Sequence, residues 1–273
     1  KNFKTIKCLF KAFKECQTII KEFKPDIVIG VGGYVTVPVI ISAKKLGIKT
    51  FIHEQNSIPG KANRYLAKYC DLIGVSFKSS LDYFKGNKAV LTGNPCSENA
   101  LNKPAITKTE LGLSGAKKLV LIVMGSLGSA SVNQYILDLM PKFATKNYEV
   151  LFITGNKDYD KIISESIPQN VKVLPFYEGL TSVMKRTDLM ITRAGASTLS
   201  EIIALEVPTI LIPSPYVANN HQYINALDIV KNHAGLMIEE KNLHGDILID
   251  TIDDLINNDK KLIARKYGTD TVT

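Results

Sequence analysis

The chain has 273 residues, of which 45% are hydrophobic and 22% are charged. A usual domain has roughly 100 to 200 residues, so we expect two domains. The composition is that of an ordinary globular protein, and no stretch reaches the roughly 18 unbroken apolar residues that a membrane-spanning helix needs. These features exclude the disordered, collagen-like and transmembrane classes.

The cysteine pattern and the first residues bear on the compartment. Cys8, Cys16, Cys70 and Cys96 form no CxxC pair and have no histidine at ligand spacing, so neither a zinc site nor a disulfide framework is indicated. This pattern fits a reducing, cytoplasmic setting. The sequence opens on Lys1 with an amphipathic stretch rather than a continuous apolar run, which argues against a secretory signal and suggests part of a longer chain.

The net charge of +8 is unevenly distributed along the sequence. Residues 1–98 contain 16 Lys and Arg against 7 Asp and Glu, a balance of +9, whereas residues 99–273 contain 18 against 19, a balance of −1. A one-sided positive charge favours a polyanionic partner near the first half, either nucleic acid or an anionic membrane surface.

The first segment has the period of an amphipathic helix. Apolar residues and lysines recur every three or four positions on two different faces. Such a helix is either a surface helix with a solvated lysine face or a helix that lies on a membrane surface. The residues that set the two faces are Phe3, Ile6, Phe10, Phe13, Gln17 and Ile20 on one, and Lys4, Lys7, Lys11, Lys14 and Lys21 on the other.

After Pro25 the pattern changes to short β-branched runs separated by helical segments. This alternation predicts a parallel sheet covered by helices on both faces. The second half repeats the pattern after a polar stretch at 99–117, which we interpret as an interdomain connection. The predicted strands are 26–32, 49–54 and 71–77 in the first half, and 118–125, 148–155, 171–176, 188–195, 207–214 and 234–239 in the second.

The predicted fold class is therefore α/β, with two Rossmann-like, doubly wound parallel-sheet domains that face one another across a cleft. The domains are expected at 1–98 and 118–273. In open sheets of this kind ligands bind at the carboxyl ends of the strands, so the residues that follow each strand are the candidate site residues.

Three of these strand-end loops are rich in glycine. Residues 30–34 (GVGGY) would let a ligand approach the backbone closely. Residues 124–129 (MGSLGS) and 193–198 (RAGAST) each lead into a helix, whose backbone N–H groups and dipole favour a phosphate. Glycine turns between strand and helix are also routine structural features.

Polar residues follow other strands. The run 53–56 (HEQN) ends a predicted buried strand, which packing does not explain. Glu201 lies near the start of a helix, where its carboxylate could accept both ribose hydroxyls or simply interact with the helix dipole. Residues 219–225 (NNHQYIN) combine the donors and acceptors that sugar hydroxyls require.

No metal or cofactor is expected. The DxD run Asp158-Tyr159-Asp160 has the features of a helix start rather than of a metal site. A nicotinamide-dependent dehydrogenase is disfavoured, because no GxGxxG follows a strand with an acidic residue about 20 positions later.

Taken together, six motifs in order along nearly the whole chain resemble the MurG family of N-acetylglucosaminyltransferases, which form the lipid II precursor of peptidoglycan. The motifs are GVGGYVTVP (30–38), HEQNSIPGKANRYLAK (53–68), TGNP (92–95), GSLGSASVNQ (125–134), RAGASTLSE (193–201) and NNHQYINA (219–226).

The resemblance implies a GT-B fold, UDP-N-acetylglucosamine as donor and undecaprenyl-pyrophosphoryl-MurNAc-pentapeptide (lipid I) as acceptor. It also implies metal-independent, inverting transfer at the cytoplasmic face of the bacterial membrane, where the basic first half would dock on anionic lipid, and no nucleic-acid partner. It assigns Ser126 to the diphosphate, Phe176 and Tyr177 to the uracil, Ala196, Ser197 and Thr198 to the nucleotide, Glu201 to the ribose, and His221, Gln222 and Asn225 to the sugar. Its acceptor residues are Gly32, Gly33, Tyr34, His53, Glu54, Gln55, Asn56 and Asn63.

The sequence departs from the family pattern in several places. The first glycine-rich loop of the family, with the histidine proposed as base, has no counterpart, and the end at Thr273 comes early, so we expect a chain truncated at both ends and slow turnover. His53 and Glu54 are then the candidate bases. Ser97, Met124, Leu127 and Ala130 replace residues that are usual in the family.

Two alternatives stand beside this interpretation. A UDP-N-acetylglucosamine 2-epimerase shares the fold and the donor but needs no lipid acceptor, so the loops at 30–34 and 53–56 count against it. A nucleotide-sugar-binding module without turnover is the nonenzymatic alternative.

Overall fold

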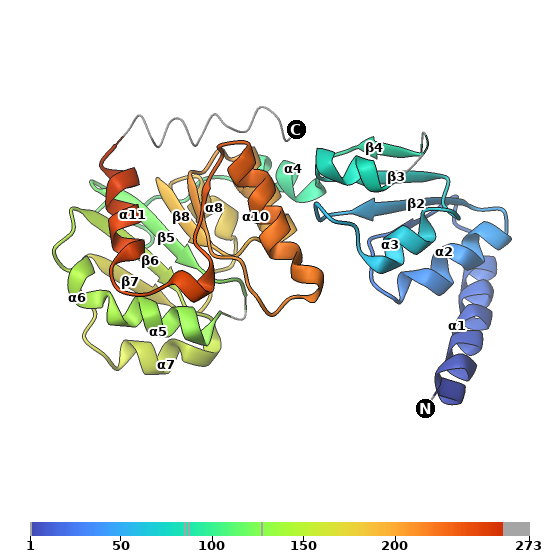
Figure 1. Ribbon diagram of the computed structural model, residues 1–273, viewed down its shortest axis with the longest axis horizontal. Helices are drawn as coiled ribbons and strands as arrows, with labels where there is room; N and C mark the ends of the chain where they lie inside the picture. The colour runs from blue at the N-terminus through green and yellow to red at the C-terminus, as the bar shows by residue number, and fades with distance from the viewer. Residues whose placement is uncertain (1, 85, 87, 127, 259–273) are drawn as a thin grey trace. The chain divides into compact units, whose positions relative to one another are not determined.

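The computed structural model describes residues 2–84, 86, 88–126 and 128–258. It contains two compact units that divide between Asn94 and Pro95. Each unit is built on one parallel sheet (Figure 1), as the alternating pattern predicts.

The first unit contains a four-stranded sheet with the strand order β1-β2-β3-β4. A long helix precedes the sheet and shorter helices connect its strands, as a parallel arrangement requires. The elements are α1 (Asn2–Phe23), β1 (Ile27–Gly30), α2 (Thr36–Lys45), β2 (Lys49–Glu54), α3 (Lys61–Leu66), β3 (Leu72–Val75), the 3₁₀ helix η1 (Lys78–Tyr83) and β4 (Ala89–Leu91).

The helices of the first unit cover one face of its sheet. On that face Ile52 and Ile73 pack with Ile40 of α2 and Leu66 of α3 in a single buried cluster. The opposite face, which we call the open face, is formed by Ile27, Ile29, Phe51, Leu72 and Val90, and four of these five side chains are at least 40% exposed.

The expected cover on both faces is therefore wrong for the described part of the first sheet. The reason lies in the alternation of a strand, whose successive side chains point to opposite faces. An unbroken apolar run such as 27–31 does not reveal whether a helix lies over each face.

The second unit contains a six-stranded sheet with the order β10-β9-β8-β5-β6-β7. The strand order reverses between β5 and β8, which makes this the topological switch point where open α/β sheets bind ligands. Its elements are α4 (Pro95–Asn102), β5 (Lys118–Val123), α5 (Ala130–Asp138), α6 (Met140–Phe143), β6 (Tyr148–Ile153), α7 (Asn156–Ile163), β7 (Val171–Leu174), α8 (Leu180–Met184), β8 (Leu189–Thr192), α9 (Ala196–Ala204), β9 (Thr209–Leu211), η2 (Ala218–Asn220), α10 (His221–Lys231), β10 (Leu236–Met237), η3 (Glu240–Asn242) and α11 (Ile247–Ile256).

Both faces of this second sheet are buried. Val120 and Ile122 of β5 belong to the cluster that includes α5, α6, α7 and α11. The alternate residues Leu119 and Leu121 point to the other face and are also 0% exposed. The predicted two-sided cover is thus confirmed for the second sheet.

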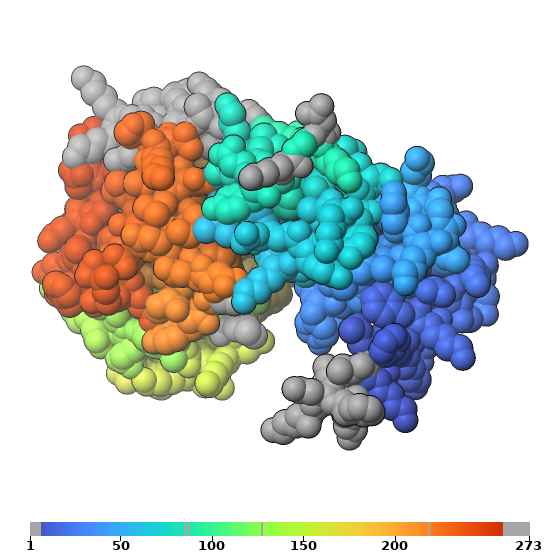
Figure 2. All heavy atoms as spheres, turned by 45° about the vertical axis from the view of Figure 1, so that its right-hand side comes forward, coloured from blue at the N-terminus to red at the C-terminus, as the bar shows by residue number. Residues whose placement is uncertain are grey.

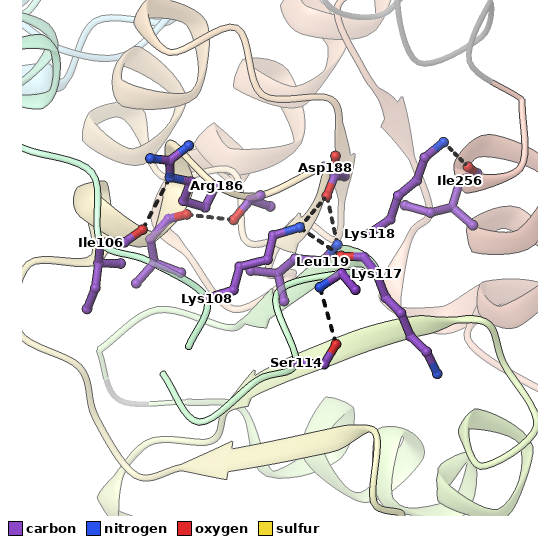
Figure 3. Close-up of polar contacts among 12 residues, drawn as sticks. Ile106, Lys108, Ser114, Lys117, Lys118, Leu119, Arg186, Asp188 and Ile256 are labelled. Atoms are coloured by element: carbon purple, nitrogen blue, oxygen red, sulfur yellow. Dashed lines mark hydrogen bonds and ion pairs between the residues drawn. The ribbon is translucent and has the colours of Figure 1, made fainter. Parts of the chain in front are cut away.

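The stretch predicted as an interdomain connection, 99–117, lies in the second unit and is bonded to it (Figure 3). Asp188 Oδ2 accepts hydrogen bonds from the backbone N of Leu119 at 2.7 Å and from Lys108 Nζ at 3.3 Å. The buried carboxylate of Glu149 accepts the backbone N–H of Ser114 at 2.6 Å. The contacts of Lys108 and Ser114 fix the stretch against the amino-terminal ends of β8 and β6.

Candidate functional site

Each unit has a group of polar residues at the carboxyl edge of its own sheet. In the first unit the group is centred on Glu54, the last residue of β2, which is 2% exposed. Its Oε1 accepts from the backbone N and the Nδ2 of Asn56 at 3.0 and 3.2 Å, and its Oε2 accepts from Gly60 N and Asn63 Nδ2 at 3.0 and 2.8 Å. Four N–H donors therefore saturate this carboxylate, and the loop that follows β2 is folded around it.

The neighbouring His53 is also fully engaged. Its Nε2 lies 2.8 Å from the carbonyl oxygen of Gly93, and because a carbonyl can only accept, Nε2 carries the proton. Its Nδ1 is then the acceptor for Gln55 Nε2 at 3.2 Å. Gly93 follows β4, so the histidine links the ends of two strands.

The glycine loop after β1 approaches this group at one point. Gly32 has φ +97°, and a Cβ there would lie 3.4 Å from Asn63 Nδ2. Asn63 also donates to the carbonyl oxygen of His53 at 3.1 Å, while its buried Oδ1 has no hydrogen-bond partner within the described part of the chain. The structure thus gathers six of the predicted acceptor residues, namely Gly32, His53, Glu54, Gln55, Asn56 and Asn63. Gly33 adjoins them, and Tyr34 is 86% exposed.

In the second unit a cavity of about 400 Å³ lies at the switch point, at the carboxyl ends of β5, β8 and β9. We call it the α5 pocket, because the first turn of α5 forms part of its wall. It is lined by Met124, Gly128, Ser129, Ala130, Ser131, Arg193, Ser214, Tyr216 and Gln222.

The loop between β5 and α5 takes its shape from glycine. Gly128 has φ +71°, and a Cβ there would lie 2.1 Å from the backbone oxygen of Thr154, so only glycine fits. This close approach to the end of β6 directs the first turn of α5 into the pocket. The N–H groups of that turn and the helix dipole favour an anion.

Arg193 supplies a buried positive charge to the α5 pocket. It follows β8 and is 8% exposed. Its Nη2 donates to Ser129 Oγ at 2.7 Å, and its Nη1 donates to the carbonyl oxygen of Ile212 at 3.0 Å and lies 2.7 Å from Glu240 Oε2. The cation is held by groups from three different loops.

Two amide side chains of α10 hold the loops around the pocket. Gln222 lines the α5 pocket, and its Oε1 accepts the backbone N–H of Ser214 at 2.9 Å. Asn225 is 0% exposed and donates to the carbonyl oxygen of Ala194 at 3.2 Å. The third predicted sugar residue, His221, opens α10 after two residues with positive φ, Asn219 and Asn220.

Glu201 lies in α9, whose first turn holds Ala196, Ser197 and Thr198. Burial raises the pKa of the Glu201 carboxyl above its ordinary value, and the nearby charge of Lys103 opposes this shift to a smaller extent. The Glu201 carboxylate has no hydrogen bond or ion pair with the part of the chain that the structure describes. A half-buried carboxylate without a partner is poised to accept donors from a ligand.

The other predicted donor residues lie outside the wall of the α5 pocket. Ser126 is exposed in the β5–α5 loop. Phe176, 53% exposed, and Tyr177 follow the edge strand β7. Of the family departures, Met124 and Ala130 line the pocket, Ser97 Oγ donates to the carbonyl oxygen of Ser200 at 3.0 Å, and Leu127 lies outside the described residues.

Sequence reasoning overlooked several residues of this region. Ser129 and Arg193 lie within the glycine-rich motifs, which were interpreted through their backbone conformation, so no role was assigned to these two side chains. Tyr216 and Glu240 lie outside every motif, and only the fold brings them to the pocket. A signal was available for Arg193, because a charged residue directly after a fully apolar strand needs a partner when it is buried.

None of the helices in the described part of the chain combines the length and the apolar character needed to cross a membrane. No group of three or more histidine, cysteine or acidic side chains within 2–84, 86, 88–126 and 128–258 could hold a metal ion.

Comparison with known proteins agrees with this two-unit organisation. Residues 1–75 match the glycosyltransferase family 28 N-terminal domain, and residues 119–271 match the glycosyltransferase family 28 C-terminal domain. Among solved structures, MurG of Acinetobacter baumannii superposes with a TM-score of 0.75 at 26% identity, over 98% of this chain and 76% of that one. The UDP-GlcNAc 2-epimerase of Neisseria meningitidis bound to UDP-GlcNAc reaches 0.69 at 15% identity, over 97% and 77%, which shows the shared fold alone.

Sequence relatives are more specific. The UDP-N-acetylglucosamine--N-acetylmuramyl-(pentapeptide) pyrophosphoryl-undecaprenol N-acetylglucosamine transferase of Bacillus cytotoxicus is 42% identical, over 98% of this chain and 76% of the relative. The enzyme of the same name from Bacillus licheniformis is also 42% identical, over 97% and 74%. The chain therefore belongs to the MurG family of N-acetylglucosamine transferases within glycosyltransferase family 28.

Proposed function

We propose that this chain transfers N-acetylglucosamine from UDP-N-acetylglucosamine to the MurNAc 4-hydroxyl of lipid I and so forms lipid II. The observation that carries the proposal is the α5 pocket, which combines a helix N-terminus with a buried arginine in a chain that is 42% identical to transferases of this name. A helix N-terminus beside a cation is suited to the diphosphate of a nucleotide sugar.

The donor would extend from this pocket along the carboxyl edge of the second sheet. Ser126 and the first turn of α5 would bind the diphosphate. The unpartnered carboxylate of Glu201 would accept the ribose hydroxyls, and Gln222 would reach the sugar. We assign Phe176 and Tyr177 to the uracil, Ala196, Ser197 and Thr198 to the nucleotide, and His221 and Asn225 to the sugar side, where Asn225 acts by holding the backbone of Ala194.

The acceptor would bind at the group around Glu54 in the first unit. We assign positioning roles to His53 and Glu54, because both ring nitrogens of the histidine and both oxygens of the carboxylate already have partners. A general base must be free to take a proton from its substrate. The buried Oδ1 of Asn63 remains available to accept a hydrogen bond from a sugar hydroxyl or a peptide N–H of lipid I.

The chemistry would be a single inverting displacement. The acceptor oxygen attacks C1 of N-acetylglucosamine as the bond from C1 to the UDP oxygen breaks, and the hydroxyl proton passes to a base. The charge that develops on the departing UDP would be stabilised by Arg193 and by the N–H groups of α5, which are preorganised for it. These groups can carry out the charge stabilisation that a metal ion performs in other transferases, so we propose metal-independent transfer.

Membrane docking would involve α1, which lies on the outer surface of the first unit (Figures 1 and 2). Its exposed side chains include Phe10 at 72% and Phe23 at 78% exposure, together with lysines such as Lys7 and Lys14. Basic helices with exposed aromatic residues bind anionic lipid surfaces. The solvated-helix alternative predicts no vesicle binding.

A radiolabelled single-turnover assay with UDP-N-acetylglucosamine and a short-chain lipid I analogue tests the proposal. Lipid II analogue with inverted configuration at C1 should form, at a rate unaffected by a metal chelator, and Glu201→Gln should reduce it. Isothermal titration calorimetry provides a readout that does not depend on turnover. UDP should bind, and Glu201→Gln should weaken its binding by about 1–3 kcal/mol.

The same experiment separates the alternatives. Release of the 2-epimer from UDP-N-acetylglucosamine in the absence of acceptor would replace the proposed function with that of an epimerase. Binding of UDP with no transfer, even when excess protein is used in single turnover, would leave a nucleotide-binding module. Failure to bind UDP would contradict the donor site itself.

A further inference from the structure

An ion pair separates the α5 pocket from a second cavity of about 280 Å³. Arg193 lines the first cavity, Glu240 lines the second, and Ser131 and Tyr216 line both. The side chains of Arg193 and Glu240 are only 10% and 12% exposed. A buried carboxylate beside the pocket proposed for a diphosphate is unexpected, because like charges repel strongly where water is scarce.

The Glu240 carboxylate occupies a place that suits a phosphate oxygen. Its Oε1 accepts a hydrogen bond at 2.5 Å from the Oγ of Ser131, a residue in the first turn of α5. Its Oε2 lies 2.7 Å from Arg193 Nη1. A hydroxyl at a helix N-terminus together with a guanidinium is a common set of donors for a phosphate group. The carboxylate is thus an internal anion bound by phosphate-type donors.

The hold of Arg193 on this carboxylate is incomplete. Glu240 Oε2 is close to Nη1 but is among the buried oxygens that accept no aligned hydrogen bond within the described residues. The hydrogen bonds to Ser129 and Ile212 use two of the five N–H groups that a guanidinium carries, and the contact with Glu240 is an ion pair. Arg193 can therefore accept a second anion from the pocket side, or exchange Glu240 for it, without losing its bonds to Ser129 and Ile212.

We infer that Glu240 is an internal counter-anion that competes with the phosphate groups of the donor nucleotide for Arg193. In the free protein Glu240 balances the buried positive charge of Arg193, whose other two contacts within the described residues are with uncharged oxygens. When a diphosphate enters the α5 pocket, part of its binding free energy is used to overcome the attraction of Glu240 for Arg193, so Glu240 weakens nucleotide binding and favours release of the product UDP. This inference rests on the proposed function for the identity of the ligand.

The test is isothermal titration calorimetry of the full chain with UDP, UMP and uridine. Glu240→Gln removes the competing charge and should tighten UDP binding roughly fivefold or more, the lower end of usual coupling between sites. Arg193→Gln should weaken it at least about tenfold, as expected for a lost charged hydrogen bond. Both effects should decrease from UDP to UMP and vanish for uridine, which has no phosphate.

A matched control removes the same charge one residue away. Glu239 pairs with the exposed Lys241 at 3.1 Å and has no ion pair with Arg193 among the described residues. Glu239→Gln should change the affinity for UDP less than twofold. In the double variant Arg193→Gln/Glu240→Gln the gain from Glu240→Gln should disappear, because Glu240 acts through Arg193.

The outcomes are distinguishable. Unchanged or weaker UDP binding in Glu240→Gln, or an equal change for uridine, would overturn the inference. If Glu240→Gln does not fold, Glu240→Asp can replace it, because the shorter side chain withdraws the carboxylate from Arg193 by one methylene. This variant should also tighten UDP binding. Unchanged or weaker binding would count against the inference. Absence of UDP binding to the wild-type chain would instead contradict the proposed function.

Discussion

The two sheets follow the same parallel design but are buried differently. Every residue of β6 in the second unit is buried, whereas β1 in the first unit alternates between exposed and covered side chains up to Gly30. On the open face Ile29 is 61% exposed, although it lies in an apolar run as continuous as that of β6. An apolar run therefore identifies a strand of a parallel sheet, but it does not establish how many faces are covered.

The candidate sites of the two units also differ in how their carboxylates are bonded. Glu54 of the first unit accepts four N–H donors from its own loop. Glu201 of the second unit is half-buried, and burial raises its pKa. The carboxylate of Glu54, whose hydrogen bonds are all made, stabilises the loop around it. The carboxylate of Glu201 makes no such bonds within the described part of the chain, so it is available to a ligand but lowers the stability of the fold.

The largest effect expected from this contrast concerns the two sheets. Phe152→Ala, at a fully buried position of β6, should destabilise the second unit by about 3–5 kcal/mol. Ile29→Ala on the open face removes a side chain that is already 61% exposed and should cost well under about 1 kcal/mol. Urea unfolding followed by hydrogen exchange in each sheet would measure both. A comparable loss for Ile29→Ala would mean that the open face is covered in solution.

The second prediction concerns the two carboxylates. Glu54→Gln turns an NH₂ group toward donors and should destabilise the first unit by about 2–3 kcal/mol, as expected for lost hydrogen bonds to a charged group. Glu201→Gln should instead raise the melting temperature of the ligand-free second unit at pH 7, because a carboxyl whose folded pKa is raised destabilises the fold once it is ionised. Calorimetric melts would decide, and a lower melting temperature for Glu201→Gln would reveal an unseen partner.

Much of the fold follows from local sequence. All nine predicted strands are present, because a parallel sheet needs continuous β-branched runs with helices between them, and this pattern is visible without tertiary information. The open face was not predictable, since which helix covers which face depends on contacts between distant residues. The stretch 99–117 lacks periodicity, yet two long-range contacts hold it: Glu149 accepts the backbone N–H of Ser114, and Asp188 pairs with the side chain of Lys108.

The site was predictable where function depends on the backbone. The glycine loops lie at the strand ends where the sequence places them, because positive φ and close approach require glycine at Gly32 and Gly128. The Arg193–Glu240 pair was not predictable, since its members are far apart in the sequence and only the order β10-β9-β8 brings their loops together. The neighbours that occupy His53 and Glu54 were likewise invisible in the HEQN motif.

A smaller effect is expected at the amino-terminal edge of the second sheet. Asp188→Ala leaves the backbone N of Leu119 without its acceptor and removes the ion pair with Lys108, which should cost the second unit about 1–2 kcal/mol. Asp138→Ala is a suitable control, because Asp138 is exposed and accepts only from Gln134 at 2.9 Å among the contacts described. Its effect should stay within about 0.5 kcal/mol. Equal effects for the two variants would show that 99–117 is not held by Asp188.

The smallest effect is a pH dependence confined to the first unit. Asp71 lies 2.6 Å from Lys44 Nζ and accepts the backbone N–H of Thr50 at 2.9 Å, and these contacts lower the pKa of its carboxyl from 3.8 to about 2. Because the folded pKa is depressed, this contribution to stability is fully present above about 3.8 and is lost as the pH falls toward 2. The hydrogen bond to Lys44 is the largest cause of the lowered pKa. Lys44→Met should therefore raise the lower limit of the pH range over which this stability is lost.

Acid titrations of the first unit's stability would compare wild type with Lys44→Met and Asp71→Asn. Since the pair is solvent-exposed, added salt should diminish the difference between wild type and Lys44→Met. A wild-type profile that Asp71→Asn leaves unchanged would show that Asp71 does not link α2 to β2 and β3 in solution.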